Sequence, residues 1–84
     1  MEKVYGVKVY YMVDSQLYTK KQDAINRFWM IYNANKDMQE RLKQIYEEDD
    51  FKNDFKDFSS WLIDYLWSGD DEECELRVYY LNRD

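Results

Sequence analysis

The sequence has no histidine, no proline, one cysteine and two glycines. Without histidine, neither a Ser-His-Asp nor a Cys-His catalytic arrangement is available, and a zinc site is excluded. Gly6 and Gly69 alone cannot build a glycine-rich phosphate loop. The single Cys74 cannot form an internal disulfide, which favours a reducing, cytoplasmic setting. These absences predict a protein that is not an enzyme and needs no cofactor.

Long apolar runs are also missing. No stretch approaches the roughly 20 apolar residues that span a bilayer, and the N-terminus lacks the apolar segment of a signal peptide. We therefore expect a soluble chain without a membrane partner. Its 84 residues are enough for one domain, residues 1–84, and its nine tyrosines, four phenylalanines and three tryptophans supply a core.

Negative charge is concentrated in the second half of the chain. Residues 1–44 contain eight basic and five acidic side chains, whereas residues 45–84 contain four basic and thirteen acidic ones. This distribution argues against direct nucleic-acid binding by the acidic half. It favours a basic partner, a metal ion or simple solubility. The spacing of an EF-hand calcium loop is absent, so we expect no specific metal site.

The first half of the chain predicts two strands and two helices. Residues 4–13 are rich in β-branched and aromatic side chains and predict a strand, which a turn at Asp14 and Ser15 would return as a short strand over residues 16–18. Thr19 is the expected N-cap of a first helix. The polar segment 33–37 predicts a break, after which a second helix would run to about Tyr46.

The second half predicts a long helix and a final strand. At 100° per residue, one apolar stripe contains Phe51, Phe55, Phe58 and Leu62. We expect this helix to begin near residues 47–50 and to end at Gly69, a residue that adopts a left-handed cap without steric cost. Residues 74–82 alternate as a strand and would pair with residues 4–13. The predicted fold is α+β, in the order β-β-α-α-α-β, with a small, mainly antiparallel sheet and helices on one face.

Acidic side chains would line one flank of the predicted long helix. Carboxylates at steps of three and four residues repel each other, and aspartate is a mediocre helix former, so such a row costs stability and invites a functional interpretation. Trp61 would lie exposed in this row as an aromatic anchor. The expected partner-binding residues are Glu48, Asp49, Asp50, Asp54, Asp57, Trp61, Asp64, Asp70, Asp71 and Glu72.

Residues 46–58, YEEDDFKNDFKDF, resemble the acidic helical segments of small phage-borne inhibitors, in particular type II anti-CRISPR proteins. The resemblance implies a stoichiometric inhibitor in the cytoplasm of a bacterial host cell. It would act as an acidic DNA mimic that blocks the DNA-binding surface of an RNA-guided CRISPR nuclease.

A different class of function is compatible with the same sequence. The chain would then be a small structural or partner-binding module, either a homodimer formed through its aromatic surface or an antitoxin-like protein. In this interpretation the acidic face only keeps an aromatic-rich protein soluble.

Overall fold

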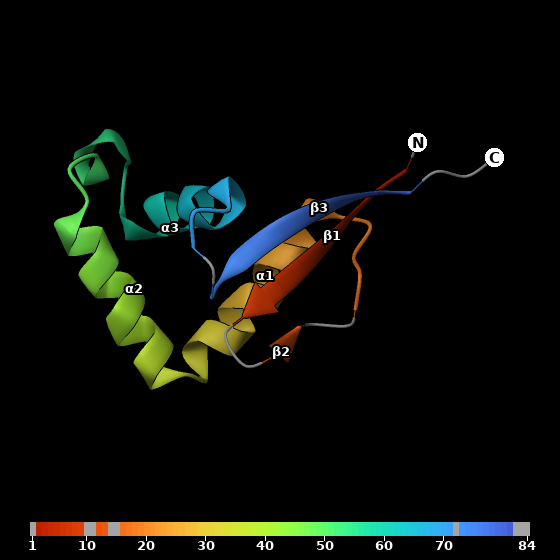
Figure 1. Cartoon of the computed structure of the whole chain (residues 1–84), viewed down its shortest axis with the longest axis horizontal. Coiled ribbons are helices and arrows are strands. Elements are labelled where there is room, and N and C mark those ends of the chain that lie inside the picture. Colours follow the sequence, from red (N-terminus) through yellow and green to blue (C-terminus); the bar gives the residue numbers. More distant parts are fainter. Residues whose placement is uncertain (1, 10–11, 14–15, 72, 82–84) are drawn as a thin grey trace.

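The computed structural model describes residues 2–9, 12–13, 16–71 and 73–81. It confirms the α+β class and the predicted order of strands and helices (Figure 1). The elements are β1 (Glu2–Val9), β2 (Met12–Val13), α1 (Lys21–Asn33), α2 (Lys36–Glu48), the short 3-10 turn η1 (Lys52–Asp54), α3 (Phe58–Ser68) and β3 (Glu75–Leu81). None of the described helices is long and apolar enough to cross a membrane.

The sheet is antiparallel and has the strand order β2-β1-β3. As predicted, the first and last strands pair, with a register that runs from Glu2 opposite Leu81 to Lys8 opposite Glu75. The single strand predicted over residues 4–13 is wrong. β1 ends at Val9, and β2 folds back so that Val13 lies opposite Lys8. Strand propensity is high throughout this run, so composition alone does not locate the reversal.

Two neighbouring predictions have different outcomes. The strand expected at residues 16–18 is reduced to one bridge, in which Tyr5 and Tyr18 exchange backbone hydrogen bonds of 2.8 Å. The turn expected at Asp14 and Ser15 lies outside the described residues.

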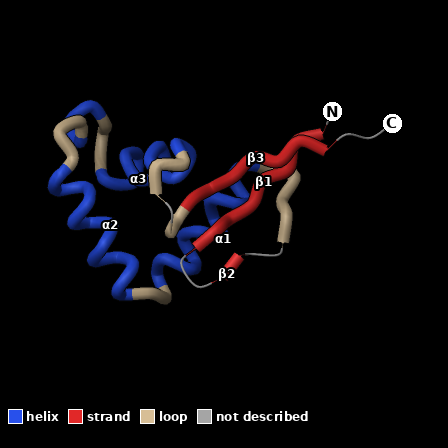
Figure 2. The backbone as a smooth tube through the Cα atoms, in the orientation of Figure 1, coloured by secondary structure: helices blue, strands red, loops and turns tan. Residues whose placement is uncertain are grey.

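α1 and α3 pack against the sheet. Figure 2 shows α1 crossing behind β1 and β3, and α2 packs mainly against α1 and α3. Apolar side chains recur at helical spacing on α1 and α2 and alternate on the strands, so each element buries one face. The main core contains Val7, Val9, Ala24, Phe28, Tyr32, Met38, Leu42, Trp61, Leu62, Leu66, Cys74 and Leu76.

The helix boundaries in the first half follow local capping. The predicted break is confirmed, because α1 ends at Asn33 and α2 begins at Lys36. The Asn35 side chain caps α2 by accepting a 3.0 Å hydrogen bond from the Met38 backbone N–H. Thr19, however, is not the cap of α1. Lys20 occupies that position, and it makes no side-chain capping bond.

The long helix predicted over residues 47–68 is wrong. α2 continues to Glu48, the chain turns through η1, and α3 begins only at Phe58. The side chain of Phe51 is 68% exposed, whereas Leu62 is completely buried. Aspartate and asparagine bind nearby backbone groups in turns and caps, and these local bonds override the helical spacing of the phenylalanines. The predicted stop at Gly69 is confirmed by its left-handed backbone (φ 77°).

The interruption between α2 and α3 predicts that substitutions of Leu62 and Phe51 have different effects on stability. Leu62→Ala should lower the free energy of unfolding by about 2–5 kcal/mol because it opens a cavity in the core. Phe51→Ala should change it by less than about 0.5 kcal/mol because that ring is exposed. Urea denaturation of both variants tests this contrast. Equally large losses of unfolding free energy in both variants would instead support a continuous helix in which Phe51 is buried.

Candidate protein-binding site

The predicted acidic residues divide into two groups in the structure. Asp49, Asp57 and Asp71 make hydrogen bonds that stabilise the fold. The second group is exposed and consists of Glu48, Asp50, Asp54, Asp64 and Asp70. In the described part of the chain, the carboxylates of this group make no hydrogen bond and no ion pair. Glu72 lies outside the described residues.

Trp61 is a core residue, so its predicted role as an exposed anchor is wrong. Its side chain is 2% exposed and stacks on Tyr65, with 4.9 Å between ring centroids and 9° between planes. The indole N–H donates a 2.6 Å hydrogen bond to the Asp49 carboxylate. Asp49 also accepts from the Phe51 backbone N–H at 2.8 Å. The bonds from Phe51 and Trp61 lower the pKa of Asp49.

Asp57 is the N-cap of α3 and not part of a continuous acidic row. Its carboxylate accepts a 2.8 Å hydrogen bond from the Ser60 backbone N–H. That bond, with a further one from the Ser60 side chain, lowers the pKa of Asp57. The cap accounts for an aspartate at this position without any partner.

Asp71, another of the predicted partner-binding residues, has a structural role. Its side chain is buried, with the whole residue 3% exposed. It accepts hydrogen bonds from Arg41 Nη2 at 2.6 Å, from the Tyr65 hydroxyl at 2.9 Å, and from the backbone N–H groups of Glu73 and Cys74 at 2.8 and 3.0 Å. Burial raises the pKa of Asp71, but these hydrogen bonds outweigh it and hold the pKa below its usual range.

Tyr65 and Arg41 each donate a side-chain hydrogen bond to Asp71. The pKa of Tyr65 is raised to about 12, first by burial and then by its hydrogen bond to the Asp71 carboxylate. Arg41 also forms a 2.9 Å ion pair with Glu73. We call these four residues, Arg41, Tyr65, Asp71 and Glu73, the Asp71 clasp. The clasp joins α2, α3 and the segment that leads into β3.

Asp71→Asn should lower the free energy of unfolding by about 1–3 kcal/mol at neutral pH, because an amide cannot satisfy the same four donors. The folded-state pKa of Asp71 lies below its unfolded value, so its stabilisation is present above about pH 4 and is lost as the pH falls. The difference between wild type and variant should therefore shrink in acid. Urea denaturation from about pH 6 to about pH 2 measures it, and a constant difference would contradict this assignment.

The acids without structural partners gather mainly between α2 and α3. We call residues 47–54 the acidic turn; it has five carboxylates and one lysine. Lys52 donates to the Glu47 backbone carbonyl at 3.0 Å and lies 3.4 Å from the Glu47 carboxylate. The carboxylates of Glu48, Asp50 and Asp54 remain uncompensated. Asp64 lies in the middle of α3 and Asp70 beyond its end, so the predicted residues do not form a single row.

The acidic turn lies at an electrostatically unfavourable position. Glu47 and Glu48 occupy the last turn of α2, which contains no basic residue. Partial negative charge from unpaired carbonyls accumulates at a helix C-terminus and repels carboxylates. In the predicted helix, which begins near residues 47–50, these acidic side chains would lie at the N-terminus, where the partial positive charge of unpaired N–H groups stabilises them. Their actual position removes that explanation.

An exposed aromatic ring projects from the same turn. Phe51 lies between Asp50 and η1, and its carbonyl accepts a 3.0 Å hydrogen bond from the Asp54 backbone N–H. In Figure 1 the turn lies at the end of the molecule opposite the chain termini, and the longest dimension is 46 Å. The turn therefore presents an exposed apolar ring, with Asp50 and Asp54 close to it in the chain, at one tip of an elongated protein.

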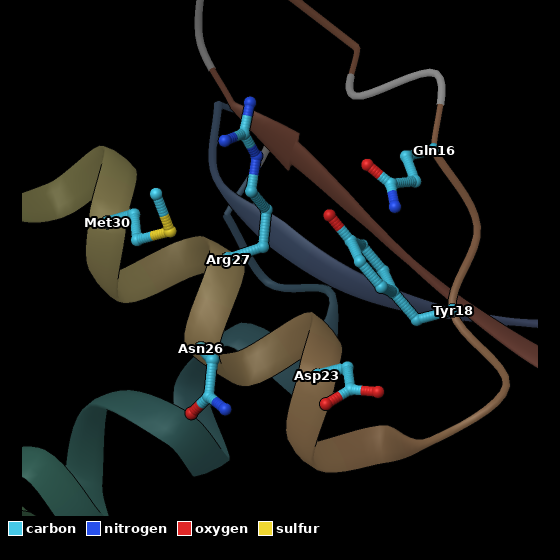
Figure 3. Close-up of a pocket in the computed structure, with 6 residues that line it drawn as sticks. All are labelled: Gln16, Tyr18, Asp23, Asn26, Arg27 and Met30. Carbon is cyan, nitrogen blue, oxygen red and sulfur yellow. The ribbon is translucent and has the colours of Figure 1, made fainter.

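The structure also contains a shallow, open hollow beside α1 (Figure 3). Its lining residues are Gln16, Tyr18, Asp23, Asn26, Arg27 and Met30. In Figure 3 the guanidinium of Arg27 and the hydroxyl of Tyr18 extend toward the β1 side, whereas Asp23 and Asn26 lie on the opposite side. These side chains do not converge on a common point, and they include no nucleophile beside a base. In the described part of the chain, acidic and cysteine side chains form no group that would hold a metal ion.

Comparison of the chain with protein-family models, with curated proteins and with solved structures found no match. The acidic turn is thus identified from its own geometry and charge.

Proposed function

We propose that this protein is a non-catalytic, stoichiometric inhibitor that inserts its acidic turn into the nucleic-acid-binding surface of a basic protein. The observation that carries the proposal is that Phe51 is 68% exposed and lies close in the chain to Asp50 and Asp54, two exposed residues whose carboxylates have no partner in the described part of the chain. An exposed aromatic ring close to acidic side chains without structural partners suits a binding surface, in which an apolar anchor is surrounded by polar contacts.

The charges of the turn match a surface that binds nucleic acid. Such surfaces align Arg and Lys side chains against phosphates, which in duplex DNA occur once per roughly 1.7 Å of axis. Carboxylates accept the same charge-assisted hydrogen bonds, and guanidinium groups bind them in a bidentate manner. Glu48, Asp50 and Asp54 are exposed and available for these contacts. Association would also be accelerated by attraction between opposite charges.

Phe51 would supply affinity that charge alone does not. Moving a phenylalanine side chain from water into an apolar pocket contributes about 1.5–3 kcal/mol. Aromatic residues near the centre of an interface, surrounded by polar contacts, are common hot spots. The expected target surface is therefore basic with an apolar depression at its centre.

An RNA-guided CRISPR nuclease is the first target to test. Support for this class comes from the resemblance of residues 46–58 to acidic segments of type II anti-CRISPR proteins, and from small size and acidity. These nucleases use Arg and Lys to read the short DNA motif beside the target and to hold the DNA strands. A carboxylate cluster that occupies those groups would prevent DNA binding.

The decisive experiment titrates the protein into RNA-guided DNA nucleases and follows DNA binding and cleavage at several salt concentrations. We expect loss of DNA binding near one equivalent of inhibitor, with the inhibition weakening as salt increases. If no nuclease in a panel responds, this target class is wrong. A pull-down from bacterial lysate, eluted with salt, would then look for another basic partner.

Charge variants locate the interaction on the acidic turn. Neutralising three acids in Glu48→Gln, Asp50→Asn, Asp54→Asn should weaken binding to the basic target at least about tenfold, or about 1.4 kcal/mol. A matched control, Asp23→Asn, Asp37→Asn, Glu40→Gln, removes the same charge from exposed positions on α1 and the start of α2. The control should change affinity by less than about threefold. Equal losses in both triple variants would show that only net charge matters.

Phe51→Ala tests the aromatic anchor separately. Because the ring is exposed, the variant should keep its melting temperature while its affinity for the same target falls about tenfold. Calorimetric titration with the wild type and the variant measures the difference. Unchanged affinity would remove Phe51 from the interface.

A further inference from the structure

β3 forms an open edge of the sheet. In the strand order β2-β1-β3, one side of β3 pairs with β1, and no described segment pairs with the other. The strand contains no proline, and it carries Val78, Tyr79 and Tyr80, which are exposed large apolar side chains. Its two charges, Glu75 and Arg77, form an ion pair with each other. The usual protections of an edge strand, such as lysine, proline or a bulge, are therefore missing here.

The backbone hydrogen bonds show which residues of β3 face outward. Tyr5 exchanges both of its backbone hydrogen bonds with Tyr18, on the side of β1 that faces away from β3. Tyr5 lies opposite Val78, so Val78 directs its own N–H and C=O away from β1. These directions alternate along a strand. Leu76, Val78 and Tyr80 therefore present unpaired backbone groups at the open edge.

We propose that the open edge binds a second copy of this chain, with the two β3 strands antiparallel and the two-fold axis at Val78. Three outward-facing residues centred on Val78 form a self-complementary set. Leu76 of one copy lies opposite Tyr80 of the other, and Val78 lies opposite Val78. The two three-stranded sheets become one continuous sheet of six strands.

The side chains favour this register. Directly opposite residues share a face, so Arg77 of each copy lies opposite Tyr79 of the other, where a guanidinium contacts an aromatic ring favourably. A register centred on Arg77 would place two arginines opposite each other, which is destabilising. Registers shifted further leave outward-facing backbone groups of β3 without a partner.

Charge does not oppose this association, although each chain has a net charge of −6. β3 carries one acidic and one basic side chain, Glu75 and Arg77, and the neighbouring β1 carries Glu2, Lys3 and Lys8, so both signs are present near the interface. The acidic turn lies at the other end of the molecule from the free ends of β1 and β3 (Figure 1). Two copies can therefore join through β3 while their acidic turns remain apart.

Light scattering after gel filtration, from about 1 μM to about 1 mM, tests the association. We expect the mass to rise with concentration from 10.5 kDa to about twice that value. A mass that stays at one chain throughout overturns the proposal, as does open-ended growth beyond a dimer.

A cysteine at the two-fold axis tests the register. Residues paired through hydrogen bonds have Cα atoms about 5.5 Å apart, so two thiols at such a pair lie within reach of a short bismaleimide, although their Cβ atoms are too far apart for an unstrained disulfide. Val78→Cys should therefore give a dimer when treated with a short bismaleimide. Tyr80→Cys should not, because each Tyr80 lies opposite Leu76. The wild-type protein is the control for cross-linking through Cys74, which is buried. Efficient cross-linking at position 80 but not at position 78 overturns the register.

Two proline variants separate association from folding. Val78→Pro removes an outward N–H, so the variant should keep its circular-dichroism spectrum and become a monomer. Tyr79→Pro removes an N–H that pairs with Val4 of β1 and should lower the melting temperature. If Val78→Pro fails to fold, Val78→Lys replaces it by placing two positive charges at the axis. A folded Val78→Lys variant that dimerises like wild type overturns the proposal.

Discussion

The Asp71 carboxylate receives hydrogen bonds from three parts of the chain: a guanidinium on α2, a hydroxyl on α3, and two backbone N–H groups just before β3. α2 packs mainly on other helices and not on the sheet, so the clasp directly links it to the chain segment that enters β3. A buried carboxylate is stabilising only when its partners remain in place. The placement of α2, and of the acidic turn at its end, therefore depends on this group together with the core side chains Met38 and Leu42. Two separate acidic clusters therefore have different roles: Asp71 and Glu73 contribute to the clasp, whereas residues 47–54 supply the exposed charge.

Sequence reasoning succeeded where the signal was local or strongly periodic. The alternation of residues 74–82 predicted β3 and its pairing with β1, and the polar segment 33–37 predicted the break between α1 and α2. It failed over residues 47–58, where the spacing of the phenylalanines matched a helix by coincidence. Asp49 and Asp57 determine the actual backbone there by binding N–H groups two and three residues ahead. In the sequence, Asp49 was the available signal for a turn and Asp57 was the available signal for the start of a new helix.

The candidate site was predicted only in part, for a related reason. Charge density identified the region in which Glu48, Asp50 and Asp54 are exposed and belong to the acidic turn. It could not separate these residues from Asp71, whose partner Arg41 is thirty positions away in the chain. The predicted burial of two aromatic residues was also reversed. Helical spacing placed Phe51 in the core and Trp61 outside, whereas Phe51 is exposed and Trp61 is buried. Which aromatic is buried depends on tertiary contacts that no local pattern contains.

The bond between Asp49 and the Trp61 indole has a consequence for the entropy of binding. Ordering a flexible loop on association opposes affinity, and each immobilised side chain adds to that cost. Here the acidic turn is already tied to the core through Trp61, and Lys52 holds its backbone to the end of α2. The turn is thus preorganised, and little conformational freedom would remain to be lost in the proposed binding of a partner around Phe51. A short loop can then bind as a rigid surface would, although it contains only three residues of regular structure between α2 and α3.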